Sequence, residues 1–179
     1  MRVRDHVLIA TASAAVTAPF IGRAAIGLWA GGVLIDADHY VWFCLRHRSV
    51  SPRAAMRLFG QADPARHPAT RLLHAPAAVL GVLLLGLRQR RLLPAAFGMA
   101  MHAALDARHA ARMERARSAA LARDGYSCQV CGTGTPAAGA HLRRQPLLLP
   151  SYRAENLISL CGPCHEAAHT RLSRPAPWT

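Results

Sequence analysis

Two Cys-x-x-Cys pairs in the C-terminal part of the chain have the spacing of a structural metal site. Each pair puts two thiolates on one tight turn, and two such turns supply four soft anionic ligands for a tetrahedral cation, most often zinc. Twenty-nine residues separate the two pairs, which leaves room for a β-hairpin or a loop. We therefore expect one structural zinc ion to join two segments that are distant in sequence. Its predicted ligands are Cys128, Cys131, Cys161 and Cys164.

Polar residues between and after these pairs have the types needed for a second, catalytic cation. His165 and His169 are four residues apart, so they share one face of the helix expected to begin near Pro163. Asn156 lies nine residues before His165, and His141 lies fifteen before Asn156. Each residue alone suits a loop or a solvated helix face, whereas their joint occurrence favours a site.

Residues 117–170 resemble the HNH endonucleases, which have a zinc-braced ββα-metal fold. The matching elements are the Arg-Asp-Gly-Tyr-x-Cys-x-x-Cys-Gly string that begins at Arg123 and the single histidine His141. They continue with the Glu-Asn-Leu-Ile-x-Leu-Cys string from Glu155 and the Cys-His-x-x-x-His string from Cys164. The resemblance implies an enzyme that hydrolyses DNA phosphodiester bonds with Mg²⁺ or another divalent cation.

The same resemblance implies a role for each matching residue. His141 would be the general base that activates water, and Asn156 would hold the loop that orients it. His165 and His169 would lie at the catalytic cation, which polarises the scissile phosphate. One position departs from the family, because Ala140 stands where a metal-ligating Asp or His is common. The alternative is therefore a zinc-braced module that binds nucleic acid without cleaving it.

The charge of the chain points to an anionic partner. Twenty-two basic residues, all of them arginine, stand against nine acidic ones, and the net charge is +13. Such a balance favours nucleic acid or an acidic membrane face. Five arginines near the nuclease-like motif are the predicted phosphate contacts: Arg117, Arg123, Arg143, Arg144 and Arg153. The pattern does not separate DNA from RNA, and no feature of it assigns an oligomeric state.

The first 108 residues differ from the remainder in being rich in Ala, Leu, Val and Gly. Their apolar periodicity predicts four helices, at residues 7–18, 23–35, 71–87 and 92–108, with a proline-containing connection over residues 46–70. Residues 72–87 are the best membrane candidate, although a spanning helix needs about 20 apolar residues. We expect this half to associate with a membrane, either embedded in it or resting on its cytoplasmic leaflet. A wholly cytoplasmic protein is the alternative.

Ionisable residues in this apolar half indicate a second metal site. Asp36-Ala37-Asp38-His39 follows an apolar helix, and His102 and Asp106 share a helix face. Histidines together with carboxylates are typical of hydrolytic metal centres. Residues 1–108 also resemble, less specifically, bacterial membrane-bound metal-dependent hydrolases. The resemblance implies six candidate ligands: His6, Asp36, His39, His74, His102 and Asp106.

These observations predict a mainly α protein of two domains. Residues 1–108 are expected to form an apolar helical bundle, and residues 109–179 to form an entering helix and a small zinc-braced ββα-metal domain. The favoured function is that of an HNH-type endonuclease tethered by the helical domain. A third hypothesis puts the chemistry in residues 1–108, as a membrane-bound metal-dependent hydrolase.

Overall fold

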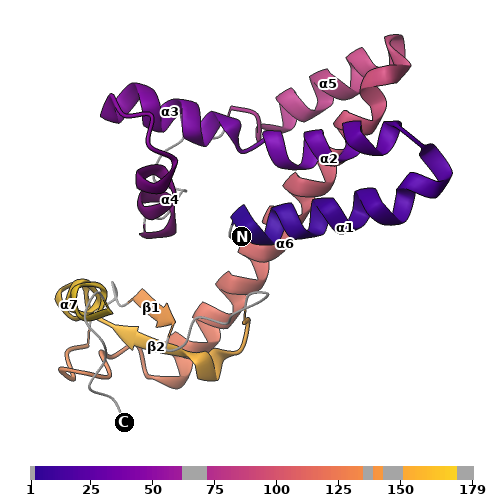
Figure 1. Cartoon of the computed structure of the whole chain (residues 1–179). Helices are drawn as coiled ribbons and strands as arrows, with labels where there is room; N and C mark the ends of the chain where they lie inside the picture. The colour runs from indigo at the N-terminus through magenta and orange to yellow at the C-terminus, as the bar shows by residue number, and fades with distance from the viewer. Residues whose placement is uncertain (1–2, 62–71, 135–138, 143–150, 173–179) are drawn as a thin grey trace. The chain divides into compact units, whose positions relative to one another are not determined.

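The computed structural model describes residues 3–61, 72–134, 139–142 and 151–172 (Figure 1). Within these ranges the chain is mainly helical, as the sequence predicts, and its strands lie in the C-terminal part. The chain divides into two compact units, Met1–Ala107 and Arg108–Thr179, which are described separately below.

The first unit begins with a helical hairpin. Helix α1 (Val3–Ile21) ends where Gly22 adopts a φ of +56°, and the Gly22 N–H donates to the Ala18 carbonyl at 2.9 Å. Glycine adopts this left-handed conformation without a steric penalty, so it can close the helix and redirect the chain. Helix α2 (Ala24–Leu34) then packs on α1.

The remaining helices of the first unit follow in short succession. They are α3 (Ala37–His47), α4 (Pro52–Gln61), α5 (Pro76–Arg88), the short 3₁₀ turn η3 (Arg90–Leu92) and α6 (Leu93–Arg123). Helix α6 continues beyond residue 108, where the sequence places a domain boundary, so its second half belongs to the other unit.

Helix α4 lies inside the segment predicted to be a connection, and that prediction is wrong. Ser51-Pro52 was interpreted as a helix breaker, but it starts the helix. Pro52 occupies the first helical position, where its missing N–H costs nothing. The Ser51 hydroxyl accepts a hydrogen bond from the Ala54 N–H at 3.4 Å, as an N-cap residue does.

Small residues let helices α2 and α6 approach closely. A Cβ on Gly98 of α6 would overlap the Leu28 carbonyl oxygen of α2, and a Cβ on Gly31 would overlap the Ala95 carbonyl oxygen. Small residues such as Ala10, Ala25 and Ala96 are buried in this unit together with the larger Ile35 and Phe43. This crossing sets the distance between α2 and the buried part of α6, which carries His102.

The segment predicted as the best membrane candidate, residues 72–87, forms a turn followed by α5, which begins only at Pro76. Among the described residues, no helix is both long enough and apolar enough to cross a bilayer. Several large apolar side chains of the first unit are exposed, including Phe20 at 85%, Val16 at 70% and Ile26 at 68%.

The second unit consists of the end of α6, a two-stranded antiparallel sheet and a final helix. Strand β1 (Gly139–Leu142) pairs with β2 (Leu157–Leu160), and His141 lies opposite Ile158. The 3₁₀ turn η4 (Ala154–Asn156) precedes β2, and α7 (Gly162–Leu172) follows it. Leu157 packs on Ala116 and Ala120 of α6, so β2 is anchored to that helix.

Candidate functional site

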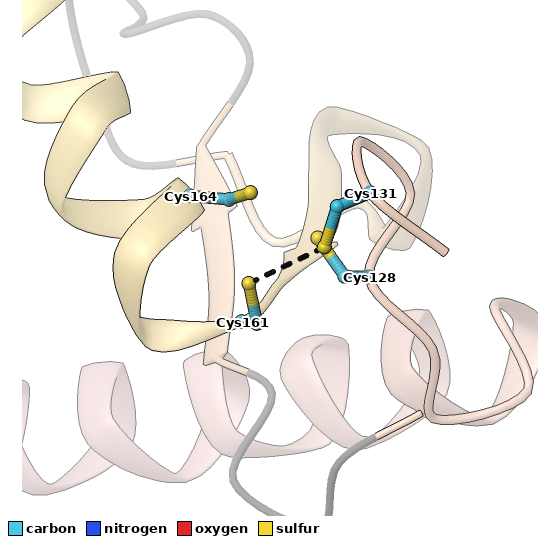
Figure 2. Close-up of side chains that lie close together, drawn as sticks. All are labelled: Cys128, Cys131, Cys161 and Cys164. Atoms are coloured by element: carbon cyan, nitrogen blue, oxygen red, sulfur yellow. Dashed lines mark hydrogen bonds between the residues drawn. The ribbon is translucent and has the colours of Figure 1, made fainter. Parts of the chain in front are cut away.

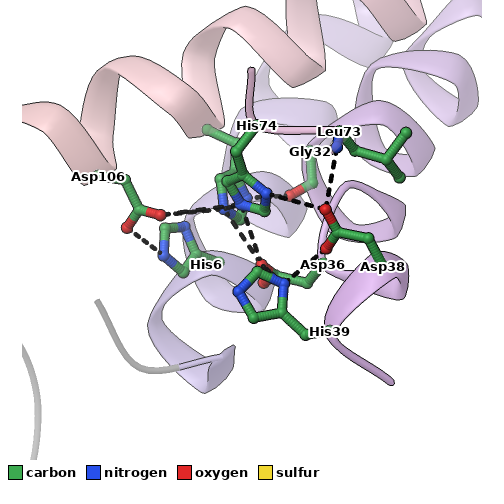
Figure 3. Close-up of polar contacts among 9 residues, drawn as sticks. His6, Gly32, Asp36, Asp38, His39, Leu73, His74 and Asp106 are labelled. Carbon is green, nitrogen blue, oxygen red and sulfur yellow. Dashed lines mark hydrogen bonds and ion pairs between the residues drawn. The ribbon is translucent and has the colours of Figure 1, made fainter. Parts of the chain in front are cut away.

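Seven ionisable side chains of the first unit gather in one place (Figure 3). They come from α1, from the α2–α3 junction and the start of α3, from the turn before α5, and from α6. The structure thus brings together all six ligand candidates predicted from the sequence and adds Asp38. We call this group the His/Asp cluster: His6, Asp36, Asp38, His39, His74, His102 and Asp106.

The centre of the His/Asp cluster is the Nε2 atom of His102. It lies 3.2 Å from Nε2 of His74, 3.5 Å from Oδ1 of Asp36 and 3.6 Å from Oδ2 of Asp106. One imidazole nitrogen and two carboxylate oxygens therefore surround the His102 nitrogen. This donor set suits a divalent cation that accepts both nitrogen and oxygen ligands.

The backbone of α2 orients His102. Its Nδ1 lies 2.8 Å from the Gly32 carbonyl oxygen, which can only accept, so Nδ1 carries the proton and Nε2 faces the carboxylates. The side chain is only 1% exposed. Burial lowers the pKa of His102, but Asp106, Asp36 and the Gly32 carbonyl outweigh it, and the net pKa is raised. An imidazole fixed by a carbonyl in this way resembles the support of metal-ligating histidines.

His6 covers the other side of this centre. Its ring stacks on His102 with centroids 3.8 Å apart, and its Nε2 lies 3.0 Å from Oδ1 of Asp106. Its buried Nδ1 has no hydrogen-bond partner among the described residues. A buried polar atom without a partner costs free energy, so this nitrogen marks a position where a ligand would add stability.

Both central carboxyl groups are held in the ionised form. Burial raises the pKa of Asp106, but hydrogen bonds from His102 and His6 outweigh it, and the pKa falls well below the usual range. Burial likewise raises the pKa of Asp36, and His74 together with the charge of His102 more than offsets it. The cluster thus keeps anionic oxygen ligands at neutral pH.

Asp38 was left out of the ligand set predicted from the sequence, and it positions two of the histidines. Its Oδ1 lies 2.6 Å from Nδ1 of His39, and its Oδ2 accepts a hydrogen bond from the Leu73 N–H at 3.0 Å. Because Leu73 precedes His74, the second bond fixes the turn that carries His74. The Asp38-His39 adjacency in the sequence was the available signal, but the contact with Leu73 spans 35 residues.

The second unit contains the predicted cysteine site (Figure 2). The four sulfur atoms of Cys128, Cys131, Cys161 and Cys164 lie within 4.8 Å of one another, and those of Cys131 and Cys161 are 3.6 Å apart. This cluster can bind a metal ion such as zinc. The first pair lies on a tight turn closed by Gly132, whose φ is +74° and whose N–H donates to the Cys128 carbonyl at 2.9 Å.

The environment of the cysteines lowers the pKa of both Cys128 and Cys131, where contacts with Thr133 act on Cys131, and so favours their thiolate forms. Burial raises the pKa of Cys128, but hydrogen bonds from the backbone N–H groups of Cys161, Cys131 and Val130 outweigh burial and lower the pKa to about 6. The Cys161 thiol and burial raise the pKa of Cys164 to about 12. Four sulfurs this close cannot all ionise without a cation between them, which is the electrostatic signature of a metal site.

The nuclease-like residues come from consecutive elements of the second unit. His141 lies on β1, Asn156 ends η4 just before β2, and His165 lies in the first turn of α7, where its N–H donates to the Cys161 carbonyl at 2.8 Å. His169 lies on the same helix. The side chains of His141 and His169 fall outside the described part of the structure.

The predicted phosphate contacts differ in their surroundings. Arg123 donates to both carboxylate oxygens of Asp124 and to the carbonyls of Ala154 and Leu157, so its guanidinium joins the end of α6 to β2. Arg117 is half-exposed and lies 3.9 Å from Glu114. Arg153 is exposed. Arg143 and Arg144 lie outside the described residues.

The chain therefore contains two side-chain clusters of different chemistry that could hold a metal ion, a soft cysteine cluster and a harder His/Asp cluster. Comparison with protein-family models, with curated proteins and with solved structures finds no match to this chain.

Proposed function

We propose that the second unit is an HNH-type endonuclease that hydrolyses DNA phosphodiester bonds with a divalent cation. The observation that carries the proposal is the order β1, β2, α7 braced by four converging cysteines. His141 lies on β1, and Asn156 lies in the turn before β2. The Cys-His-x-x-x-His string lies on the helix that follows, α7.

Each residue has a distinct role in this proposal. His141 accepts a proton from the water that attacks phosphorus, and the bond to the leaving sugar oxygen breaks. Asn156 holds the segment before β2 and so fixes the partner strand of His141. His165 and His169 would hold the catalytic cation, which supplies charge stabilisation at the phosphate. The cysteines would hold zinc, which contributes folding energy to a small unit.

Relaxation of supercoiled plasmid tests the proposal. We expect nicking that requires Mg²⁺ or Mn²⁺ and that the His141→Ala variant lacks. His47→Ala serves as the matched control, because His47 is an exposed histidine of α3 outside both clusters. An RNA substrate in parallel distinguishes the two nucleic acids. Cleavage by His141→Ala at the wild-type rate would overturn the assignment. Cation-independent DNA binding without any cleavage would favour the non-cleaving module. Such a module would agree with the presence of Ala140 where the family commonly has a metal ligand.

A second function is proposed for the first unit, that of a metal-dependent hydrolase of phosphate or lipid-like esters. The observation in its favour is that side-chain atoms of His74, Asp36 and Asp106 lie 3.2–3.6 Å from Nε2 of His102. A cation bound there would polarise the substrate and lower the pKa of water. The chain itself contributes the buried, oriented donors, with His102 fixed by the Gly32 carbonyl.

Hydrolysis of bis-p-nitrophenyl phosphate with Mn²⁺ or Zn²⁺ separates the two functions. If the His/Asp cluster is catalytic, His102→Ala and Asp106→Asn remove this activity and His141→Ala retains it. The converse pattern assigns the activity to the second unit. Retention of the activity in all of these variants would assign it to a contaminant and refute both.

We infer that the first unit associates with lipid. The exposed apolar side chains of α1, α2 and α5, among them Phe20, Ile26 and Leu84, support this inference, as does the arginine-rich turn at Arg90 and Arg91. Apolar contacts combined with basic residues are typical of proteins that lie on an anionic leaflet. Co-sedimentation with phosphatidylglycerol vesicles tests it, and equal recovery with and without vesicles would contradict it.

A further inference from the structure

A shallow hollow of about 360 Å³ lies on the second unit, outside both metal clusters. The second half of α6 forms one wall, and the segment that enters η4 forms the other. The lining residues are Arg112, Arg115, Ala116, Ala119, Tyr152 and Ala154. Tyr152 does not belong to the set of residues that the sequence assigns to chemistry or to phosphate contact.

Tyr152 is held in a defined orientation at this hollow. Its hydroxyl lies 2.9 Å from Nδ1 of His109, and the two rings meet edge to face with centroids 5.5 Å apart. The guanidinium carbon of Arg112 lies over the Tyr152 ring, 5.4 Å from its centroid. A cation over an aromatic face is attracted by the ring quadrupole, so the contact also restrains Arg112.

The hollow has the charge and the surface of a site for an aromatic anion. Alanines at 116, 119 and 154 leave space beside the Tyr152 ring, and two guanidinium groups stand at its edge. Among the described residues, no carboxylate lies within ion-pair distance of Arg112 or Arg115, whereas the neighbouring Arg117 has Glu114 at 3.9 Å. The two guanidinium groups thus retain their capacity to bind an external anion.

We propose that this hollow binds one nucleotide of a single-stranded segment of nucleic acid, with the base packed against the paired Tyr152 ring and Arg112 guanidinium and the phosphate on the two arginines, Arg112 and Arg115. Aromatic stacking together with arginine–phosphate contact is the chemistry by which proteins hold single strands. The inference deepens the proposed nuclease function, on which it rests, because it gives that unit a strand-holding site outside the predicted catalytic residues.

Fluorescence anisotropy of a labelled ten-nucleotide oligothymidine, without added divalent cation, measures this binding apart from cleavage. Arg112→Gln/Arg115→Gln should weaken binding at least tenfold and reduce the slope of log affinity against log salt by about 1.4, since each lost phosphate contact on a single strand changes it by about 0.7. Tyr152→Leu should weaken binding about tenfold, and Tyr152→Phe, which keeps the ring, should retain most of it.

The matched control is Arg53→Gln/Arg57→Gln, which removes the same charge from exposed arginines of α4 in the first unit. Equal loss in this variant would mean that only net charge matters and would overturn the proposal. Wild-type affinity in Tyr152→Leu would overturn it as well, provided that bound zinc shows the variant to be folded. His141→Ala should bind like the wild type even where nicking fails, so loss of the nuclease function and loss of this site are distinguishable.

Discussion

Single side chains in the His/Asp cluster are fixed by bonds to groups that are not ligands themselves. His102 donates to the Gly32 carbonyl, and Asp38 accepts from the Leu73 N–H. In each case one polar atom of the side chain bonds to the backbone, and its other polar atom faces the rest of the cluster. The geometry of the cluster therefore depends also on residues that are not among the four central ones, His74, His102, Asp36 and Asp106.

Asp38→Ala tests this dependence. We expect cation affinity to fall by about 10–100-fold with unchanged stoichiometry, because His39 and the turn that carries His74 lose their support. Asp38→Asn retains an acceptor for the Leu73 N–H, so its cation affinity should lie between that of Asp38→Ala and that of the wild type. Calorimetric titration with Mn²⁺, which thiolates bind weakly, measures the affinity. Glu114→Gln is the control, since Glu114 is a surface carboxylate of the other unit. Affinity within twofold of the wild type in Asp38→Ala would contradict the positioning role.

Asp124 gives the second unit a pH-dependent restraint. The Arg123 guanidinium lowers the pKa of Asp124, burial opposes it, and the bonds from Ser159 lower it further, to about 2. A carboxyl whose pKa is lower in the folded state stabilises that state above its unfolded value of 3.8. This contribution is lost as the pH falls from about 4 to about 2.

Asp124→Asn should therefore destabilise the second unit at neutral pH by about 1–3 kcal/mol, because Arg123 and the Ser159 N–H lose an anionic acceptor. The difference in stability between Asp124→Asn and the wild type should become smaller below about pH 4. Hydrogen exchange of β2 peptides, compared between the two proteins at each pH, measures it. This comparison cancels the release of zinc by acid, which affects both proteins. A difference that is constant from pH 7 to pH 3 would exclude Asp124 as its origin.

At the scale of the elements, the α2–α6 crossing is the contact that sets the His/Asp cluster. The Gly32 carbonyl of α2 and His102 of α6 lie 2.8 Å apart at the ligand end of this crossing. Gly98 and Gly31 permit the approach because backbone atoms of the facing helix occupy the space of a Cβ. Backbone atoms cannot move aside as the end of a flexible side chain can, so the helices must separate if either position gains a side chain.

Gly98→Ala is expected to lower the free energy of unfolding by about 1–3 kcal/mol and to weaken cation binding at the His/Asp cluster. Gly81→Ala is the matched control, because Gly81 is an exposed helical glycine of α5 with nothing near its Cβ position. That change should stabilise by up to about 1 kcal/mol through helix propensity. Circular dichroism during thermal unfolding measures both. Destabilisation of equal size in the two variants would contradict the packing argument.

The sequence predicts the presence of the elements better than their limits. Apolar periodicity locates α1, α2, α5 and α6, because each buries one face. It does not show that α6 runs on to Arg123, because the exposed part of that helix carries arginines in place of apolar residues. It also misses α3, which lies in none of the four predicted helices, and α4, because Ser51-Pro52 is compatible with both a turn and a helix start. Tertiary context decides such cases.

At the scale of the whole molecule, the two metal clusters differ in how far sequence reasoning reaches them. The cysteine spacing specifies its ligands directly, and the four sulfurs do converge. The His/Asp cluster draws on four separate segments, so its composition was implied by a resemblance. The stacking of His6 on His102 and the role of Asp38 come only from the fold. Arg123 shows the same limit, because a phosphate contact and an internal brace look identical in sequence.

These donor sets lead to a final prediction about metal content. Thiolates prefer zinc, whereas the mixed nitrogen and oxygen donors of the His/Asp cluster also accept Mn²⁺ and similar cations. The whole chain should therefore hold two classes of cation that are lost independently. Cys161→Ser should remove zinc and unfold the second unit, because a small unit depends on the ion for folding energy. It should leave Mn²⁺ binding at the His/Asp cluster intact.

His102→Ala/Asp106→Asn should do the reverse, keeping zinc at the cysteines and removing the Mn²⁺ bound at the His/Asp cluster. Plasma emission spectrometry of dialysed protein counts both metals, and hydrogen exchange reports which unit has opened. The double variant tests more than a single ligand loss, because His102 and Asp106 each contact His6 or His74 as well as each other. Coupled loss of both metals in either variant would mean that the two clusters do not fold independently, and the division of labour proposed for the two units would then fail.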